Sequence, residues 1–201
     1  MRWIALAAAL AAAAAHAQQQ APPNAILLVA KPGLADPNFR QTVVLVTQAE
    51  DSSTIGVILN RPTRLRLAEL VPGMPGAERH AEPVFFGGPV MPGAIVALFH
   101  SEKPPEAPAF HVLQEVYLTM HPANIEALLA APQRRYRLYA GFSGWAPRQL
   151  QGEMARDGWF VLAPDAELLF RSDVSGMWDE LLAKTRGRRT AARREGDILL
   201  P

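Results

Sequence analysis

Two runs of aliphatic and β-branched residues, separated by one short polar turn, constrain the fold of this chain more than any other feature. The first run covers residues 42–47 (TVVLVT) and the second covers residues 54–59 (TIGVIL), with a polar turn over residues 50–53. β-Branched residues favour extended backbone, and a short polar turn between two such runs is typical of neighbouring antiparallel strands. We therefore predict a β-hairpin over 42–59, which ends at Asn60-Arg61-Pro62 because proline cannot donate to a sheet ladder.

The remaining predicted elements are short and alternate irregularly. Strands are predicted at 24–30, 84–86, 94–99, 111–118, 136–140 and 159–163, and helices at 65–70, 122–131, 147–156, 166–170 and 178–184. Asp36-Pro37-Asn38-Phe39 combines a capping residue with a proline suited to the first helical position, which predicts a further short helix. Because the order lacks the regular βαβ alternation of a parallel sheet, we predict a single domain of the α+β class.

Composition excludes several classes of protein. The chain has 201 residues, no cysteine, 49% hydrophobic residues and a formal net charge of +1. A disulfide scaffold, a thiolate metal site and a thiol nucleophile are therefore excluded, and the apolar fraction supports a packed core. The near-neutral charge argues against a nucleic-acid partner. The histidines show no metal-motif spacing, so we expect neither a metal nor a cofactor.

The first 23 residues have the layout of an export leader followed by a linker. Arg2 precedes an alanine-rich apolar run over residues 4–15, and Ala15-His16-Ala17 places small residues at both positions that a cleavage site requires. The run is shorter than the roughly 20 residues of a membrane-spanning helix. We predict a signal peptide over 1–17, cleaved after Ala17, a linker over 18–23, and a periplasmic or secreted mature protein.

A basic tail occupies residues 184–201. Its cations are Lys184, Arg186, Arg188, Arg189, Arg193 and Arg194. One interpretation is a solvated helix end whose cations lie near the negative pole of the helix dipole. The other is a patch that makes weak contact with an anionic membrane surface or another polyanion.

Polar residues and glycines gather at the ends of the predicted strands and form the candidate ligand-binding set. The set comprises Asp36, Asn38, Asn60, Arg61, Gly87, Gly88, His100 and Trp145. Arg61 offers a planar fork of donors to a ligand carboxylate or phosphate, or else it forms an ion pair with Asp36 or another acid and locks a turn. Gly87-Gly88-Pro89 predicts either an amide nest for an anion or a tight turn.

A hydrolase is an alternative to a binding protein. His100 ends a predicted strand and is a candidate base, with a water molecule or Ser143 as the nucleophile. Ser143 lies in Gly141-Phe142-Ser143-Gly144-Trp145, which we predict to be a turn. This segment departs from the G-x-S-x-G elbow because its second glycine comes one residue early. The sequence therefore favours binding without catalysis.

Five segments in order resemble the AlgH/YqgE family of bacterial proteins. They are residues 36–39 with 42–44, residues 56–62 (GVILNRP), residues 87–90 (GGPV), residues 93–100, and residues 141–145 with Gln149-Leu150, Trp159, Pro164 and Phe170. The resemblance predicts an AlgH/YqgE-like domain over 24–183. It implies a bifurcated mixed β-sheet closed as a pseudo-barrel and flanked by short helices. The family has no established biochemical activity; it has been linked to regulation of exopolysaccharide (alginate) production, and a transcriptional role was suggested.

The chain departs from the family pattern in two places. Gln48 stands in the hairpin turn where the family usually has a histidine, so a metal or acid–base role does not carry over to that position. Family members usually start near the first strand and look cytoplasmic, whereas this chain has a predicted leader. We therefore expect a binding or regulatory module of the bacterial envelope whose candidate residues converge in one cleft, with a small molecule or a protein as its partner. Without cleavage of the leader, a cytoplasmic transcription-linked regulator is the alternative.

Overall fold

The computed structural model describes residues 24–49, 51–131 and 134–186. The predicted signal peptide (1–17), the linker (18–23) and residues 187–201 of the basic tail lie outside these ranges. No helix of the described ranges is both long enough and apolar enough to span a membrane.

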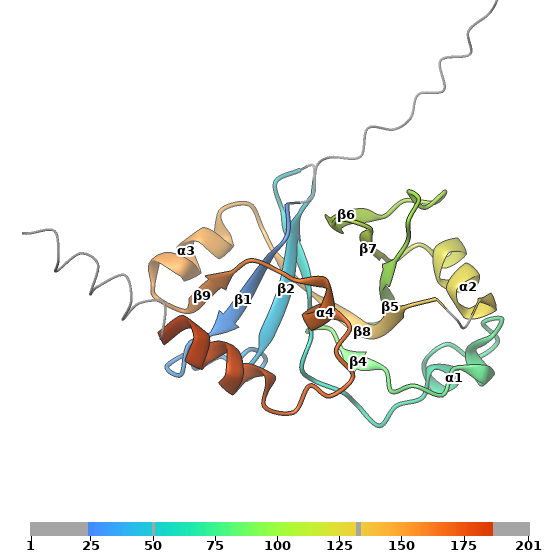
Figure 1. Ribbon diagram of the computed structural model, residues 1–201, viewed down its shortest axis with the longest axis horizontal. Helices are drawn as coiled ribbons and strands as arrows, with labels where there is room; N and C mark the ends of the chain where they lie inside the picture. Colours follow the sequence, from blue (N-terminus) through green and yellow to red (C-terminus); the bar gives the residue numbers. More distant parts are fainter. Residues whose placement is uncertain (1–23, 50, 132–133, 187–201) are drawn as a thin grey trace, which may run out of the picture.

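One mixed sheet organises the described chain (Figure 1). Its strands lie in the order β6-β7-β5-β8-β3-β2-β1-β9, and β4 pairs with β8 beside this path. Most neighbours are antiparallel, whereas β4 and β8 are parallel. The strands are β1 (Ile26–Ala30), β2 (Val43–Gln48), β3 (Thr54–Ile58), β4 (Phe85–Phe86), β5 (Val90–His100), β6 (Phe110–Leu113), β7 (Val116–Thr119), β8 (Tyr136–Trp145) and β9 (Trp159–Leu162).

The sheet divides at β8. The first half of β8 pairs with β5 on one edge and with β4 on the other, whereas its last residues pair with β3. Strands β3 and β4 therefore share one edge of β8, and the sheet curls into a half-barrel. This confirms the α+β class and the bifurcated mixed sheet that the resemblance implied, and β2 with β3 forms the predicted hairpin.

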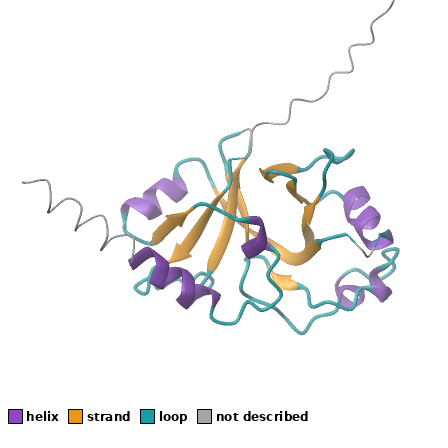
Figure 2. Ribbon diagram, in the orientation of Figure 1, coloured by secondary structure: helices purple, strands orange, loops and turns teal. Residues whose placement is uncertain are grey.

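Short helices flank the sheet (Figure 2). Near β9 lie α3 (Gln149–Ala155) and a helix over residues 177–186, and α4 (Ala166–Leu169) precedes the latter. Near β5 and β7 lies α2 (Pro122–Ala130), with α1 (Leu67–Leu70) and the 3-10 helix η1 (Ala77–Arg79) beyond it. One set of helices therefore lies near the β9 edge of the sheet, and another set lies near β5 and β7.

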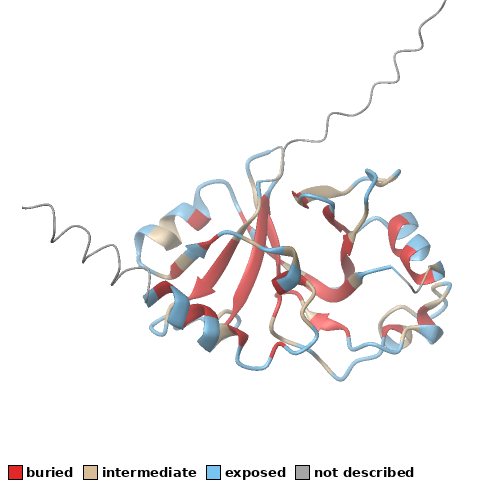
Figure 3. Cartoon of the chain, in the orientation of Figure 1, coloured by how far each residue is buried: buried red, intermediate tan, exposed pale blue. Residues whose placement is uncertain are grey.

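The central strands are buried on both faces (Figure 3). In β1, Leu27 and Val29 belong to the largest hydrophobic cluster, which includes residues of α4 and of the helix over 177–186. Leu28 and Ala30 point to the other face and belong to a cluster that includes residues of α3. Burial on both faces explains why this strand has a continuous apolar run rather than an alternating pattern.

Three sequence predictions were wrong about local structure. Residues 37–41 form a turn rather than a helix: the amide of Asn38 does donate to Asp36 Oδ1 over 2.8 Å, but Gln41 adopts a φ of 56° and the chain enters β2. The predicted strand over 111–118 is a hairpin of β6 and β7, with Glu115 at a φ of 60°. Residues 141–145 continue β8 rather than forming a turn.

Candidate functional site

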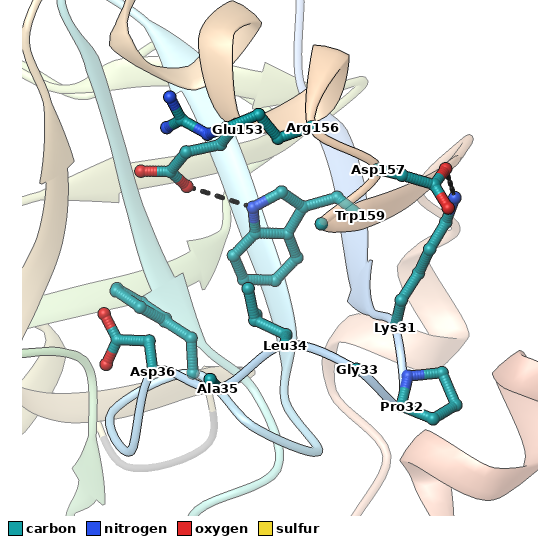
Figure 4. A pocket seen from close by; sticks show the side chains of 12 residues that line it. Lys31, Pro32, Gly33, Leu34, Ala35, Asp36, Glu153, Arg156, Asp157 and Trp159 are labelled. Atoms are coloured by element: carbon teal, nitrogen blue, oxygen red, sulfur yellow. Dashed lines mark hydrogen bonds and ion pairs between the residues drawn. The ribbon is translucent and has the colours of Figure 1, made fainter.

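A cleft of about 610 Å³ opens between two segments that are distant in the sequence (Figure 4). One wall is the connection between β1 and β2, and the other consists of the end of α3, the turn after it and the start of β9. The lining residues are Lys31, Pro32, Gly33, Leu34, Ala35, Asp36, Phe39, Glu153, Arg156, Asp157, Gly158 and Trp159.

Phe39 and Trp159 line the cleft and form a ring cluster with Trp145, which packs behind the lining; we call this cluster the aromatic floor. Phe39 stacks on Trp145 with 5.6 Å between ring centroids, and it meets Trp159 edge-on at 5.7 Å. Glu153 Oε2 accepts hydrogen bonds from the indole nitrogens of both tryptophans, each over 3.1 Å. Both tryptophans are buried, so these bonds satisfy two donors that water does not reach and hold the rings in place.

Lys31 ties the two walls together at one end of the cleft. Its ammonium pairs with the Asp157 carboxylate, and its backbone amide donates to the Gly158 carbonyl over 3.0 Å. The same ammonium lies 4.5 Å from the centre of the Phe160 ring, within the range of a cation–π contact. The positive charge of Lys31 is therefore already engaged by the protein.

Asn60 and Arg61 hold the first wall from behind. The Arg61 guanidinium donates to the carbonyls of Asn38 over 2.5 Å and Arg40 over 3.0 Å. Asn60 donates to the Gln41 carbonyl and accepts from the amide that begins β2, each over 2.9 Å. Burial, followed by the charge of Arg40, lowers the pKa of the Arg61 guanidinium, while the charge of Asp36 acts in the opposite direction. Arg61 thus locks the turn, as one interpretation predicted, but through backbone carbonyls rather than through Asp36.

The structure gathers part of the predicted site around this cleft. Asp36 lines it, and Trp145 packs behind the lining against Phe39. Asn38, Asn60 and Arg61 belong to or support the loop that carries Asp36. The other predicted members, the two glycines and His100, are elsewhere.

Gly87 and Gly88 lie at a close crossing of backbones. Both are buried, and the Gly87 amide donates to the Ala140 carbonyl over 2.9 Å. A Cβ on Gly87 would lie 2.2 Å from the Gly141 carbonyl oxygen. The segment is glycine because of this contact, and the Gly87 amide is not open to an anion.

His100 is remote from the cleft, and this corrects the expected convergence. Its Nε2 lies 3.1 Å from Glu115 Oε2, and its neighbour Phe99 pairs with Tyr136 at the first residue of β8. Ser143 pairs with Gly56 near the other end of β8, about 23 Å from Tyr136 along the strand at roughly 3.3 Å per residue. Ser143 is fully buried and donates to the Gly87 carbonyl, so the proposed pairing of His100 with Ser143 is wrong.

The second wall was missed by sequence reasoning. Lys31 and Asp157 are 126 positions apart, and nothing local to either residue indicates their pairing. Glu153 lay within a correctly predicted helix, but its two tryptophan partners are set by the packing of α3 on the sheet. Among the described residues, no group of three or more histidine, aspartate or glutamate side chains is placed to hold a metal ion.

Comparisons with known proteins agree with this architecture. Residues 27–190 match a family model described as AlgH-like. A UPF0301 protein of Myxococcus xanthus is 35% identical over 78% of this chain and 87% of its own length, and one of Xanthomonas campestris is 35% identical over 76% and 83%. The solution structure of the AlgH protein from Pseudomonas aeruginosa superposes with a TM-score of 0.63 at 26% identity, covering 76% of this chain and 85% of that one. A crystal structure of a Corynebacterium diphtheriae protein shares the fold, with a TM-score of 0.61 at 20% identity, over 82% and 87%.

Proposed function

This chain belongs to the AlgH-like family, a family of uncharacterised function, and from that premise we propose that it is an exported, non-catalytic binding module. Its ligand occupies the cleft between residues 31–39 and 153–159. The observation that carries the proposal is the combination of a fixed aromatic floor with charged groups at the rim. Ligand sites in proteins are typically concave, largely preformed, and lined by apolar surface with a few polar groups.

The cleft is held open by bonds that do not involve a ligand. Arg61 fixes the first wall from behind, Lys31 joins it to the second wall, and Glu153 fixes both tryptophans. Such preorganisation lowers the entropy lost on binding. A volume of about 610 Å³ suits a small organic molecule.

Identifying the compound that co-purifies with the protein tests the proposed cleft directly. The wild-type protein is purified gently from its own cells, denatured, and the released small molecules are identified by mass spectrometry. Leu34→Trp fills the cleft from its lining, whereas Arg79→Ala changes an exposed residue of η1 and serves as the control. We expect the same compound from the wild type and from Arg79→Ala, and much less from Leu34→Trp. Equal recovery from all three proteins, or recovery from none, contradicts the proposed site.

Export is supported by the sequence of residues 1–17, with its apolar alanine run and its A-x-A site. Peptide mass spectrometry of protein from fractionated cells tests it. We expect the mature chain to begin at Gln18 and to occur in the envelope fraction. Recovery of intact Met1 from cytosolic protein contradicts export and favours the cytoplasmic regulator instead.

A further inference from the structure

We propose that the cleft binds a zwitterion, a small molecule with a carboxylate at one position and an ammonium group at another, such as an amino acid or a short peptide. Arg156 takes the carboxylate and Asp36 takes the ammonium. This inference rests on the proposed function, because it names the chemical class of the ligand for the same cleft.

Arg156 is the cation of the cleft that remains available to a ligand. It follows the last residue of α3, its backbone amide donates to the Gly152 carbonyl, and its side chain is exposed. Within the described ranges its guanidinium has neither a hydrogen bond nor an ion pair, whereas Lys31 is paired with Asp157. A guanidinium fork fits a carboxylate through two parallel hydrogen bonds.

Asp36 is the matching anion. Its Oδ1 accepts the Asn38 amide, which fixes the carboxylate relative to the loop, and its side chain is exposed. Among described residues its carboxylate has no salt bridge: the charge of Arg61 attracts it through space, but the hydrogen bonds of that guanidinium go to backbone carbonyls. Glu153 differs, since both of its oxygens accept hydrogen bonds from side chains of the protein.

The side chains of Asp36 and Arg156 lie on different walls of the cleft. Figure 4 shows Asp36 on the loop at one side of the Trp159 ring and Arg156 on the other wall, with Leu34 between the loop and the ring. The two side chains do not form a salt bridge with each other. A ligand of one sign can form a salt bridge with one of these groups and leaves the other without a salt-bridge partner. A zwitterion satisfies both while its apolar part lies against Leu34 and Trp159.

Blocked derivatives of two probes measure separately what the carboxylate and the ammonium group contribute to binding. The probes are L-phenylalanine and L-alanyl-L-phenylalanine, each compared with its C-terminal amide and its N-acetyl derivative. Binding to the full chain is measured by calorimetry. We expect at least one free zwitterion to bind the wild type at least tenfold more tightly than either of its blocked forms.

Two conservative variants assign each charge to its residue. Arg156→Gln is expected to abolish the tenfold preference for the carboxylate over the amide while keeping the preference for the free ammonium. Asp36→Asn keeps a side chain that caps the turn, and it is expected to abolish only the preference for the ammonium. Arg79→Gln changes neither preference. Unfolding curves confirm that each variant is folded.

Failure of this inference is distinguishable from failure of the proposed function. If neither probe binds, or if both variants keep both preferences, the zwitterion assignment is overturned. If Leu34→Trp still excludes a co-purified compound in that case, the cleft binds a different chemical class and the proposed function stands. If Leu34→Trp excludes nothing either, both fail.

Discussion

Glu153 accepts a hydrogen bond from the indole nitrogen of Trp159 over 3.1 Å, and the same carboxylate oxygen accepts a second from Trp145. One oxygen thus joins α3 to side chains of β9 and β8, whose Trp159 and Trp145 rings lie 6.4 Å apart although three strands separate β8 from β9 in the sheet. Since both indoles are buried, the hydrogen bonding of the two tryptophans depends on one side chain of α3, whereas Leu150 packs the helix on the sheet.

Replacing Glu153 with leucine removes the acceptor for both indole donors. Each buried donor left without a partner costs about 1–3 kcal/mol, so we expect Glu153→Leu to lower the free energy of unfolding by about 2–4 kcal/mol. Urea denaturation followed by far-UV circular dichroism measures the loss. Glu153→Gln keeps a carbonyl oxygen at the same place and should lose less. An exposed control is Glu126→Leu on α2, and a Glu153→Leu protein as stable as this control contradicts the assignment.

Arg61 is expected to act on the cleft through the loop that it holds. Arg61→Ala releases the carbonyls of Asn38 and Arg40, and hydrogen bonds from a charged donor contribute about 1.5–3 kcal/mol. We expect a loss of about 2 kcal/mol of stability together with weaker ligand binding, because Phe39 lies in the same loop.

His100→Ala is the matched comparison, because His100 lies at the far end of β5. It should leave ligand binding unchanged, as measured by calorimetry with the co-purified compound. Equal losses of binding in Arg61→Ala and His100→Ala would restore the single convergent site that the sequence predicted.

Features whose cause is local could be predicted from the sequence. The hairpin of β2 and β3 and the strand β1 follow from β-branched and apolar runs, and the cap at Asp36 follows from residue type. The hairpin of β6 and β7 was missed because its turn contains Gln114 and Glu115 rather than glycine, proline or asparagine.

Features whose cause is tertiary could not be predicted. Gly141 was interpreted as a turn residue, but it lies within β8 at a φ of 68°, where a Cβ would be 2.5 Å from the Gly88 carbonyl oxygen. The cleft is a similar case. Asp36 could be proposed from its own loop, whereas Glu153 and Arg156 reach the same cleft only because β9 pairs with β1.

Because of His80, the free energy of unfolding should decrease as the pH is lowered. This side chain stacks on Tyr136, with Nδ1 3.1 Å from the tyrosine hydroxyl and a buried Nε2 that has no partner in the described structure. Burial lowers the pKa of His80, while the charge of Glu82 acts in the opposite direction. The neutral imidazole is favoured by folding, so its contribution is complete above a pH of about 6.5 and is lost as the pH falls towards the lowered pKa.

The measurement compares His80→Gln with the wild type by thermal unfolding at pH values of about 7.5, 6.5 and 5.5, which span the unfolded pKa. We expect the stability difference between the two proteins to shrink or reverse as the pH falls. Protonation of the buried His80 ring destabilises only the wild type, since glutamine does not titrate. The carboxylates titrate alike in both proteins and cancel in this comparison. A difference that stays constant with pH contradicts the prediction.

The crossing of backbones at Gly87 should tolerate no side chain. A Cβ there would lie 2.2 Å from the Gly141 carbonyl oxygen and 3.0 Å from the Tyr139 Cβ, and backbone of the central strand β8 cannot move aside without breaking its pairing with β4 and β5. We expect Gly87→Ala to destabilise the fold by about 3 kcal/mol or more, in the range of severe overpacking. Gly93→Ala is the control, because a Cβ at that position has no atom within 4 Å, and it should change stability by less than about 0.5 kcal/mol. Equal unfolding midpoints for the two variants in urea would show that the crossing does not require glycine.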